Sequence, residues 1–180
     1  MKFHIFSGQG LYGTFKKVLF LCTHNTCRSI LAQVIGQRMV SRLAEKTDIS
    51  QWQFASAGSE PAGEIHPQTL LQLARRGYST EGLRSKSWDV VNDFTPDIVI
   101  TVCDSAAGET CPLWLGQTLK LHWGLPDPTL ANPADMDAQF SRVISLLESR
   151  INALISLPLS TNTAEQKTSL QSIASHFPLT

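Results

Sequence analysis

The segment 18–29 constrains this chain more than any other part of its sequence. A short apolar run ends in Cys22, and Arg28 follows six residues later. The run has the length and composition of a buried strand, and residues 29–44 carry apolar side chains spaced for one face of a helix. The loop 23–28 is therefore predicted to join a strand end to a helix N-terminus, at the edge of an open α/β sheet where ligands bind.

A loop of this kind is suited to hold a tetrahedral oxyanion. The helix N-terminus offers unpaired N–H groups and partial positive charge, and Arg28 offers a planar fork of donors. The same field is expected to lower the pKa of Cys22, and Ser29 can donate its hydroxyl to the sulfur. We predict that Cys22 is a nucleophile; the alternative is a buried structural cysteine beside a surface arginine. The other predicted loop residues are Thr23, His24, Asn25, Thr26 and Cys27.

Within the loop we assign lesser roles by side-chain chemistry. Asn25 is expected to brace the loop through its amide, and His24 to face solvent. Cys27 is expected to be a packed side chain, with a protective disulfide as the alternative.

Composition favours one globular domain. The 180 residues are 42% hydrophobic, and 15 basic residues balance 15 acidic ones, which argues against nucleic acid or an anionic membrane as the main partner. No apolar run approaches the ~20 residues that span a bilayer, and no signal peptide is found. The four cysteines could form a secreted disulfide framework, but a chain of this size and apolar content does not need one, so we expect a cytoplasmic protein with functional thiols. The expected parts are an N-terminal extension (1–16), a catalytic domain (17–157) and a polar tail or peripheral helix (158–180).

Strands and helices alternate along the chain. This order predicts an α/β fold with a four-stranded parallel sheet flanked by helices on both faces, a Rossmann-like three-layer arrangement. The expected strands are 18–21, 51–57, 97–103 and 119–123. The expected helices are 29–44, 66–77, 87–92 and 133–154, with a weak one at 164–176.

Two further cysteines carry a second signal. Cys103 ends the clearest strand, and Cys111 lies eight residues on, after the small, polar and mobile run 104–110. Because parallel strands end at one edge, we expect Cys103 to meet Cys22, which suits reduction better than hydrolysis. The alternatives are two unrelated buried cysteines or a metal pair. The spacing is wrong for a zinc half-site, so no metal site is predicted.

Asp127 stands between Pro126 and Pro128, just after an expected strand. Two prolines stiffen the backbone, which suits a carboxyl group that must be aimed as a general acid. The alternative is an ordinary turn aspartate.

Taken together, these motifs resemble the thioredoxin-coupled arsenate reductases of the low-molecular-weight protein tyrosine phosphatase superfamily. The likeness extends over about residues 17–156. The segments that carry it are CTHNTCRS at 22–29, FASAG at 54–58, the strand and later cysteine at 97–111, and HWGLPDP at 122–128.

The resemblance implies a redox mechanism. The Cys22 thiolate attacks arsenate held by the loop and Arg28, and Asp127 protonates the departing hydroxide. Cys103 then attacks Cys22 and releases arsenite, and Cys111 attacks Cys103. Thioredoxin reduces the resulting disulfide, so no bound cofactor is implied.

Departures from the family pattern keep alternatives open. The phosphatases commonly place an aromatic residue where Thr129 stands, which weakens a tyrosine phosphatase function. Some reductases carry an acidic residue that helps bind potassium where this chain has Gln33. The neutral side chain makes a potassium site doubtful. The reductant could also be glutaredoxin or another thiol donor. The competing functions are a phosphoester phosphatase with Cys103 and Cys111 as redox regulators, and a non-catalytic arsenic or redox sensor.

Overall fold

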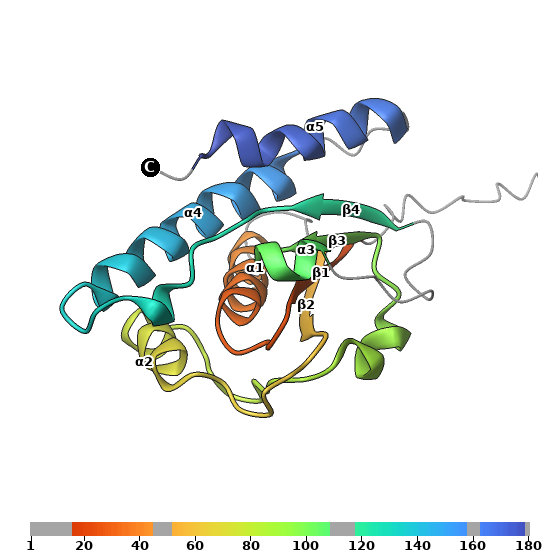
Figure 1. Cartoon of the computed structure of the whole chain (residues 1–180). Coiled ribbons are helices and arrows are strands. Elements are labelled where there is room, and N and C mark those ends of the chain that lie inside the picture. The colour runs from red at the N-terminus through yellow and green to blue at the C-terminus, as the bar shows by residue number, and fades with distance from the viewer. Residues whose placement is uncertain (1–15, 45–51, 109–117, 158–162, 179–180) are drawn as a thin grey trace, which may run out of the picture.

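Four parallel strands form the centre of the protein, in the spatial order β2-β1-β3-β4 (Figure 1). The computed structural model describes residues 16–44, 52–108, 118–157 and 163–178. The strands are β1 (Lys16–Cys22), β2 (Trp52–Gly58), β3 (Ile98–Thr101) and β4 (Leu119–His122). All three pairings are parallel, which confirms the predicted sheet.

In the described residues, helices and irregular segments lie between the strands. Pro67 begins α2, and the His66 ring accepts the Gln68 N–H at that end. The α-helices are α1 (Arg28–Ala44), α2 (Pro67–Arg75), α3 (Asp104–Gly108), α4 (Met136–Ser156) and α5 (Thr163–His176). Two short 3-10 helices are η1 (Trp88–Phe94) and η3 (Pro128–Leu130).

Both faces of the sheet are covered, but unequally. Val18 and Phe20 point into the larger core, which the apolar faces of α1, α4 and α5 complete. Leu19 and Leu21 point the other way, into a small cluster closed by η1 side chains. The apolar run before Cys22 is continuous because alternate residues fill two cores.

Two glycine positions show how tightly the layers meet. A Cβ on Gly36 of α1 would lie 2.7 Å from the Phe54 ring of β2. A Cβ on Gly58, where β2 ends, would lie 2.4 Å from the Thr23 carbonyl oxygen. Gly58 therefore lets the loop after β1 lie directly against the end of β2.

The structure refines two expectations. The run 104–110 was expected to be able to move; its first five residues form α3, in which Ala106 is buried, and residues 109–110 lie outside the described part of the chain. The strand expected over 97–103 is shorter, Ile98–Thr101, since the chain turns into that helix.

The C-terminal segment is a packed helix in its described part. Leu170 and Ile173 of α5 are buried in the larger core. The buried Arg150 of α4 donates to the carbonyl oxygens of Trp123 and Phe177, and so ties the end of α5 to the chain after β4. Among the described helices, none combines the length and apolar character that crossing a bilayer requires.

Candidate active site

The loop between β1 and α1 is held in place by hydrogen bonds to its outward-pointing carbonyl groups. Three carbonyl oxygens accept backbone hydrogen bonds from the segment 60–66. The pairs are Thr23 with Glu60 (2.9 Å), His24 with Ala62 (3.1 Å) and Thr26 with His66 (3.1 Å). Because a trans peptide points its C=O and N–H in opposite directions, the following N–H groups face inward. The loop is therefore built as a cradle of donors around its own interior.

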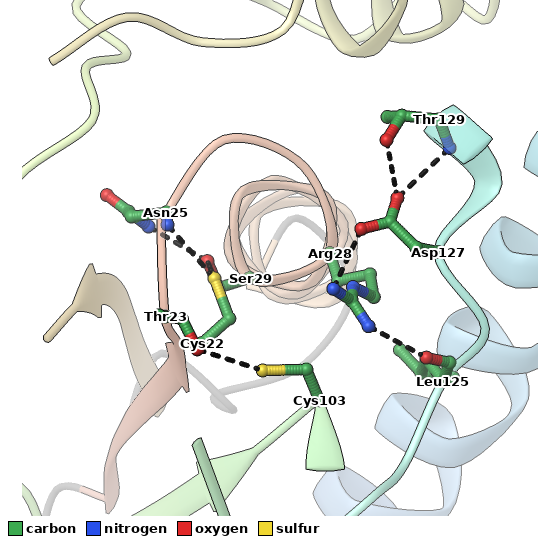
Figure 2. Close-up of polar contacts among 9 residues, drawn as sticks. All are labelled: Cys22, Thr23, Asn25, Arg28, Ser29, Cys103, Leu125, Asp127 and Thr129. Carbon is green, nitrogen blue, oxygen red and sulfur yellow. Dashed lines mark hydrogen bonds and ion pairs between the residues drawn. The ribbon is translucent and has the colours of Figure 1, made fainter. Parts of the chain in front are cut away.

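Cys22 lies at the bottom of this cradle and is 5% exposed. Its sulfur accepts the Asn25 N–H at 3.1 Å and lies 2.9 Å from the Ser29 Oγ (Figure 2). Asn25 has a φ of 50°, a left-handed conformation that asparagine tolerates better than most residues.

The pKa of Cys22 departs from the expected direction. Burial raises the pKa of this thiol above its ordinary value of 9.0. Hydrogen bonds from Ser29 and Asn25 lower it and offset part of that rise, whereas the neighbouring Cys103 raises it further. The expectation of a lowered pKa considered the helix N-terminus and omitted the loss of water around the sulfur.

The Ser29 hydroxyl is oriented by Asn25. The Asn25 Oδ1 accepts the Lys86 backbone N–H at 2.9 Å, which fixes the direction of the amide. Its Nδ2 then donates to the Ser29 Oγ at 2.8 Å and to the Ser56 Oγ at 3.1 Å. Because the Ser29 oxygen already accepts this proton, its own proton is available to Cys22.

Arg28 and Asp127 face each other across the mouth of the loop. The guanidinium donates to the Asp127 Oδ2 at 2.8 Å and to the Leu125 carbonyl at 3.0 Å (Figure 2). The other carboxylate oxygen of Asp127 accepts both the backbone N–H of Thr129 (3.0 Å) and its hydroxyl (2.7 Å). Thr129, which the sequence marked only as a departure from a family pattern, therefore holds the predicted acid.

A pocket of about 480 Å³ joins these groups. Cys22, Arg28, Cys103 and Asp127 all line it. Cys103 follows β3, is 3% exposed, and its sulfur lies 3.8 Å from the Thr23 Oγ1. The structure thus places Cys103 at the Cys22 edge, as its position after a parallel strand predicted.

The remaining loop positions differ in character. Cys27 also lines the pocket, but burial raises its pKa to about 12, which opposes a thiolate there. His24 is exposed. Cys22, Cys27 and Cys103 are free thiols. Cys111, predicted to take part in the relay, lies outside the described residues.

Lys86 was missed by the sequence reasoning, and Gln33 entered it only as a doubtful potassium position. The Lys86 Nζ lies 3.5 Å from the Gln33 Oε1 and 3.5 Å from the Ser56 Oγ. Gln33 stands where the resemblance implies an acidic potassium ligand, but it offers a neutral oxygen, and the Lys86 ammonium already contacts that oxygen. The residues therefore do not fit a bound potassium ion. Across the described ranges, no group of three or more His, Cys, Asp or Glu side chains could hold a metal.

Several arsenate reductases are similar to this chain in sequence or in fold. An arsenate reductase from Halalkalibacterium halodurans is 30% identical over 138 residues, which cover 76% of this chain and 92% of the relative. The solved arsenate reductase of Archaeoglobus fulgidus has a TM-score of 0.61 and 26% identity, and covers 78% of this chain and 99% of its own. A thioredoxin-dependent arsenate reductase from Corynebacterium glutamicum has a TM-score of 0.57 and 28% identity, over 80% of this chain and 62% of its own.

The family comparison agrees with the fold and with the loop. The family described as low molecular weight phosphotyrosine protein phosphatase matches residues 17–169, from the start of β1 into α5. This range contains the strand-loop-helix unit at Cys22, the thiol at Cys103 and the aspartate between two prolines. The chain therefore belongs to the low molecular weight phosphotyrosine protein phosphatase family.

Proposed function

We propose that this protein is an arsenate reductase whose nucleophile is Cys22 and whose first resolving thiol is Cys103. The observation that carries the proposal is the pocket that Cys22 and Cys103 share with Arg28 and Asp127. A hydrolase needs the nucleophile, the arginine and the acid, but it has no use for a second buried thiol beside them. The named relatives support the same choice.

The first step forms a covalent adduct. The Cys22 thiolate attacks the arsenic atom of arsenate, and the inward N–H groups of the loop hold the anion's oxygens. Arsenate competes with Asp127 for the Arg28 guanidinium, so binding would separate the ion pair seen in this structure. Once released, Asp127 can carry the proton that leaves with the departing hydroxide as water.

The second step transfers two electrons. The Cys103 thiolate attacks the Cys22 sulfur, the electron pair of the S–As bond passes to arsenic, and arsenite leaves. Two thiols are oxidised to one disulfide while As(V) becomes As(III). Cys111 would then attack Cys103 and free Cys22, and an external thiol reductant would reduce the final disulfide. Thioredoxin is the proposed reductant, as the name of the Corynebacterium glutamicum relative indicates for that protein.

The free thiols also bear on where the protein acts. Cys22, Cys27 and Cys103 are unpaired in the structure, and the mechanism requires Cys22 and Cys103 in reduced form. We propose that the protein works in the reducing cytoplasm.

Arsenate-dependent NADPH oxidation in the presence of thioredoxin and its reductase tests this function. Wild-type protein should turn over, whereas Cys103→Ser should release no arsenite, because no second thiol attacks the Cys22 sulfur of the adduct. Full steady-state turnover by Cys103→Ser would contradict the relay.

A phosphatase acting on small phosphoesters is the second candidate, because the family match and the oxyanion cradle favour it. Cleavage of p-nitrophenyl phosphate measures it, and Cys103→Ser should retain that activity. Phosphate release without arsenate turnover in the wild type would make the phosphatase the main function. A sensor would turn over neither substrate.

A further inference from the structure

Lys86 is anchored directly behind the catalytic loop. Its carbonyl oxygen accepts the Gly58 N–H at 2.9 Å, at the end of β2. Its own N–H donates to the Asn25 Oδ1 at 2.9 Å. The backbone of Lys86 is thus tied to both the sheet and the loop, which places its side chain between them.

The ammonium group ends a chain of buried and half-buried polar side chains. It contacts the Gln33 Oε1 and the Ser56 Oγ, and the Ser56 hydroxyl donates to the same Gln33 oxygen at 2.6 Å. The Ser56 side chain is fully buried, and Lys86 is half-buried. Burial and the nearby Arg84 lower the pKa of Lys86 to about 8, so the group is mainly charged at neutral pH.

Lys86 sets the hydrogen-bond directions along the chain in two ways, through its ammonium at Gln33 and Ser56 and through its backbone N–H at Asn25. An ammonium can only donate, so the Gln33 and Ser56 oxygens must accept from it. Asn25 in turn donates to both Ser56 and Ser29, and the Ser29 proton is left for the Cys22 sulfur. A positive charge at one end therefore favours negative charge on the sulfur at the other.

We propose that Lys86 is a positioning residue that supplies a built-in cation to the polar chain behind Cys22, in place of a bound metal ion. It acts through Gln33, Ser56, Asn25 and Ser29 and does not touch the substrate. The inference rests on Cys22 being the nucleophile, as proposed above. Its consequence is an enzyme whose nucleophile and stability do not depend on potassium.

The first test removes the charge and keeps the length of the side chain. Lys86→Met is compared with Lys120→Met, an exposed lysine on β4. The readout is the pH dependence of Cys22 alkylation by iodoacetamide, localised by tandem mass spectrometry because Cys27 lies in the same tryptic peptide. We expect Lys86→Met to shift the midpoint upward by about one unit, and so to slow labelling about tenfold at neutral pH. Lys86→Arg should restore part of the shift, and Lys120→Met should cause none.

An unchanged midpoint in folded Lys86→Met would overturn the proposal. The alkylation needs no arsenate, so it separates this inference from the proposed function. A shifted midpoint without arsenate turnover in any variant would leave the role of Lys86 intact and remove the reductase assignment. In steady-state kinetics, Lys86→Met should lower kcat and leave the KM for arsenate within about twofold.

The second test uses the cation directly, and its first part needs only the wild-type protein. Wild-type protein should show the same melting temperature and Cys22 midpoint in potassium and sodium chloride of equal ionic strength. The double variant Gln33→Glu with Lys86→Met offers a carboxylate in an emptied site, and should gain a potassium-dependent rise in melting temperature. A potassium-dependent shift in the wild type would overturn the proposal, as would a cation-independent double variant that folds.

Discussion

The two sides of the pocket are built on different principles. The Cys22 side rests on Asn25, Ser29 and Ser56, which are fully buried and bonded to one another. The mouth rests on Arg28 and Asp127, whose side chains are 20% and 24% exposed and bind each other. In the proposed reaction Cys22 must be aimed before the substrate arrives, and buried supports that hydrogen-bond to one another suit that role. The proposed reaction also requires the mouth to change partners, and an ion pair near solvent can do so at low cost.

Removal of the nucleophile should have the largest effect. Cys22→Ser replaces a thiol with a hydroxyl that is far harder to ionise, while Asn25 and Ser29 remain in place. Arsenate reduction and p-nitrophenyl phosphate cleavage should both fall by about 10⁴-fold or more. The two assays on folded protein measure this, and hydrolysis that survives would place the nucleophile elsewhere.

Arg28→Lys tests the mouth. Lysine keeps the charge but loses the planar fork, so one ammonium cannot serve both the Leu125 carbonyl and a bidentate oxyanion. The kcat/KM for arsenate should fall by about 10²- to 10³-fold.

The matched control is Arg75→Lys, an arginine that pairs with Asp137 at an exposed surface. It should change kcat/KM by less than about twofold. Equal changes in kcat/KM for Arg28→Lys and Arg75→Lys would mean that Arg28 does not bind the substrate.

Ser29→Ala tests the rigid side through pH. Attack requires the thiolate, so the rate falls as the pH drops below the pKa of Cys22. The Ser29 hydrogen bond lowers that pKa, so its loss raises the pKa and moves the acid limb to higher pH. We expect a shift of about one unit in the pH profile of kcat/KM and of Cys22 alkylation. Ser145→Ala, on the exposed surface of α4, should leave both profiles in place.

Thr129→Val should have the smallest effect of the four. It removes one hydrogen bond to the Asp127 carboxylate and leaves the backbone N–H and Arg28 contacts. Loss of about 0.7 kcal/mol of positioning lowers kcat about threefold, with little change in KM. Thr118→Val, outside the pocket, is the control, and an equal loss there would show that Thr129 does not position the acid.

Local patterns predicted most of the architecture and part of the site. The sheet followed from four short apolar segments, and the meeting of Cys22 and Cys103 followed from parallel strands ending at one edge. The α3 helix was not predicted, because five small and polar residues carry no helical apolar face. The packing of α5 was underestimated for a different reason. Arg150 of α4 donates to the Phe177 carbonyl oxygen at the end of α5, and this contact between distant residues leaves no local pattern.

Missed site residues share a physical cause. Lys86 belongs to no motif, and its proposed role depends on contacts with residues thirty or more positions away. The pKa of Cys22 was expected in the wrong direction because burial is a property of the packed structure. Thr129 was noted only because related phosphatases have an aromatic residue at its position. Its hydrogen bonds to Asp127 depend on the turn that begins η3, which the sequence did not reveal.

The sequence by itself determined which type of reaction to expect of this chain. A cysteine after a buried strand and an arginine at the next helix predict a nucleophile in an oxyanion-binding loop, because spacing along the chain sets local geometry. The tertiary structure decided how that nucleophile is supported. Only folding brings Cys103, Asp127 and Lys86 to one loop, because burial, charge and hydrogen-bond direction arise from residues that are distant in the chain.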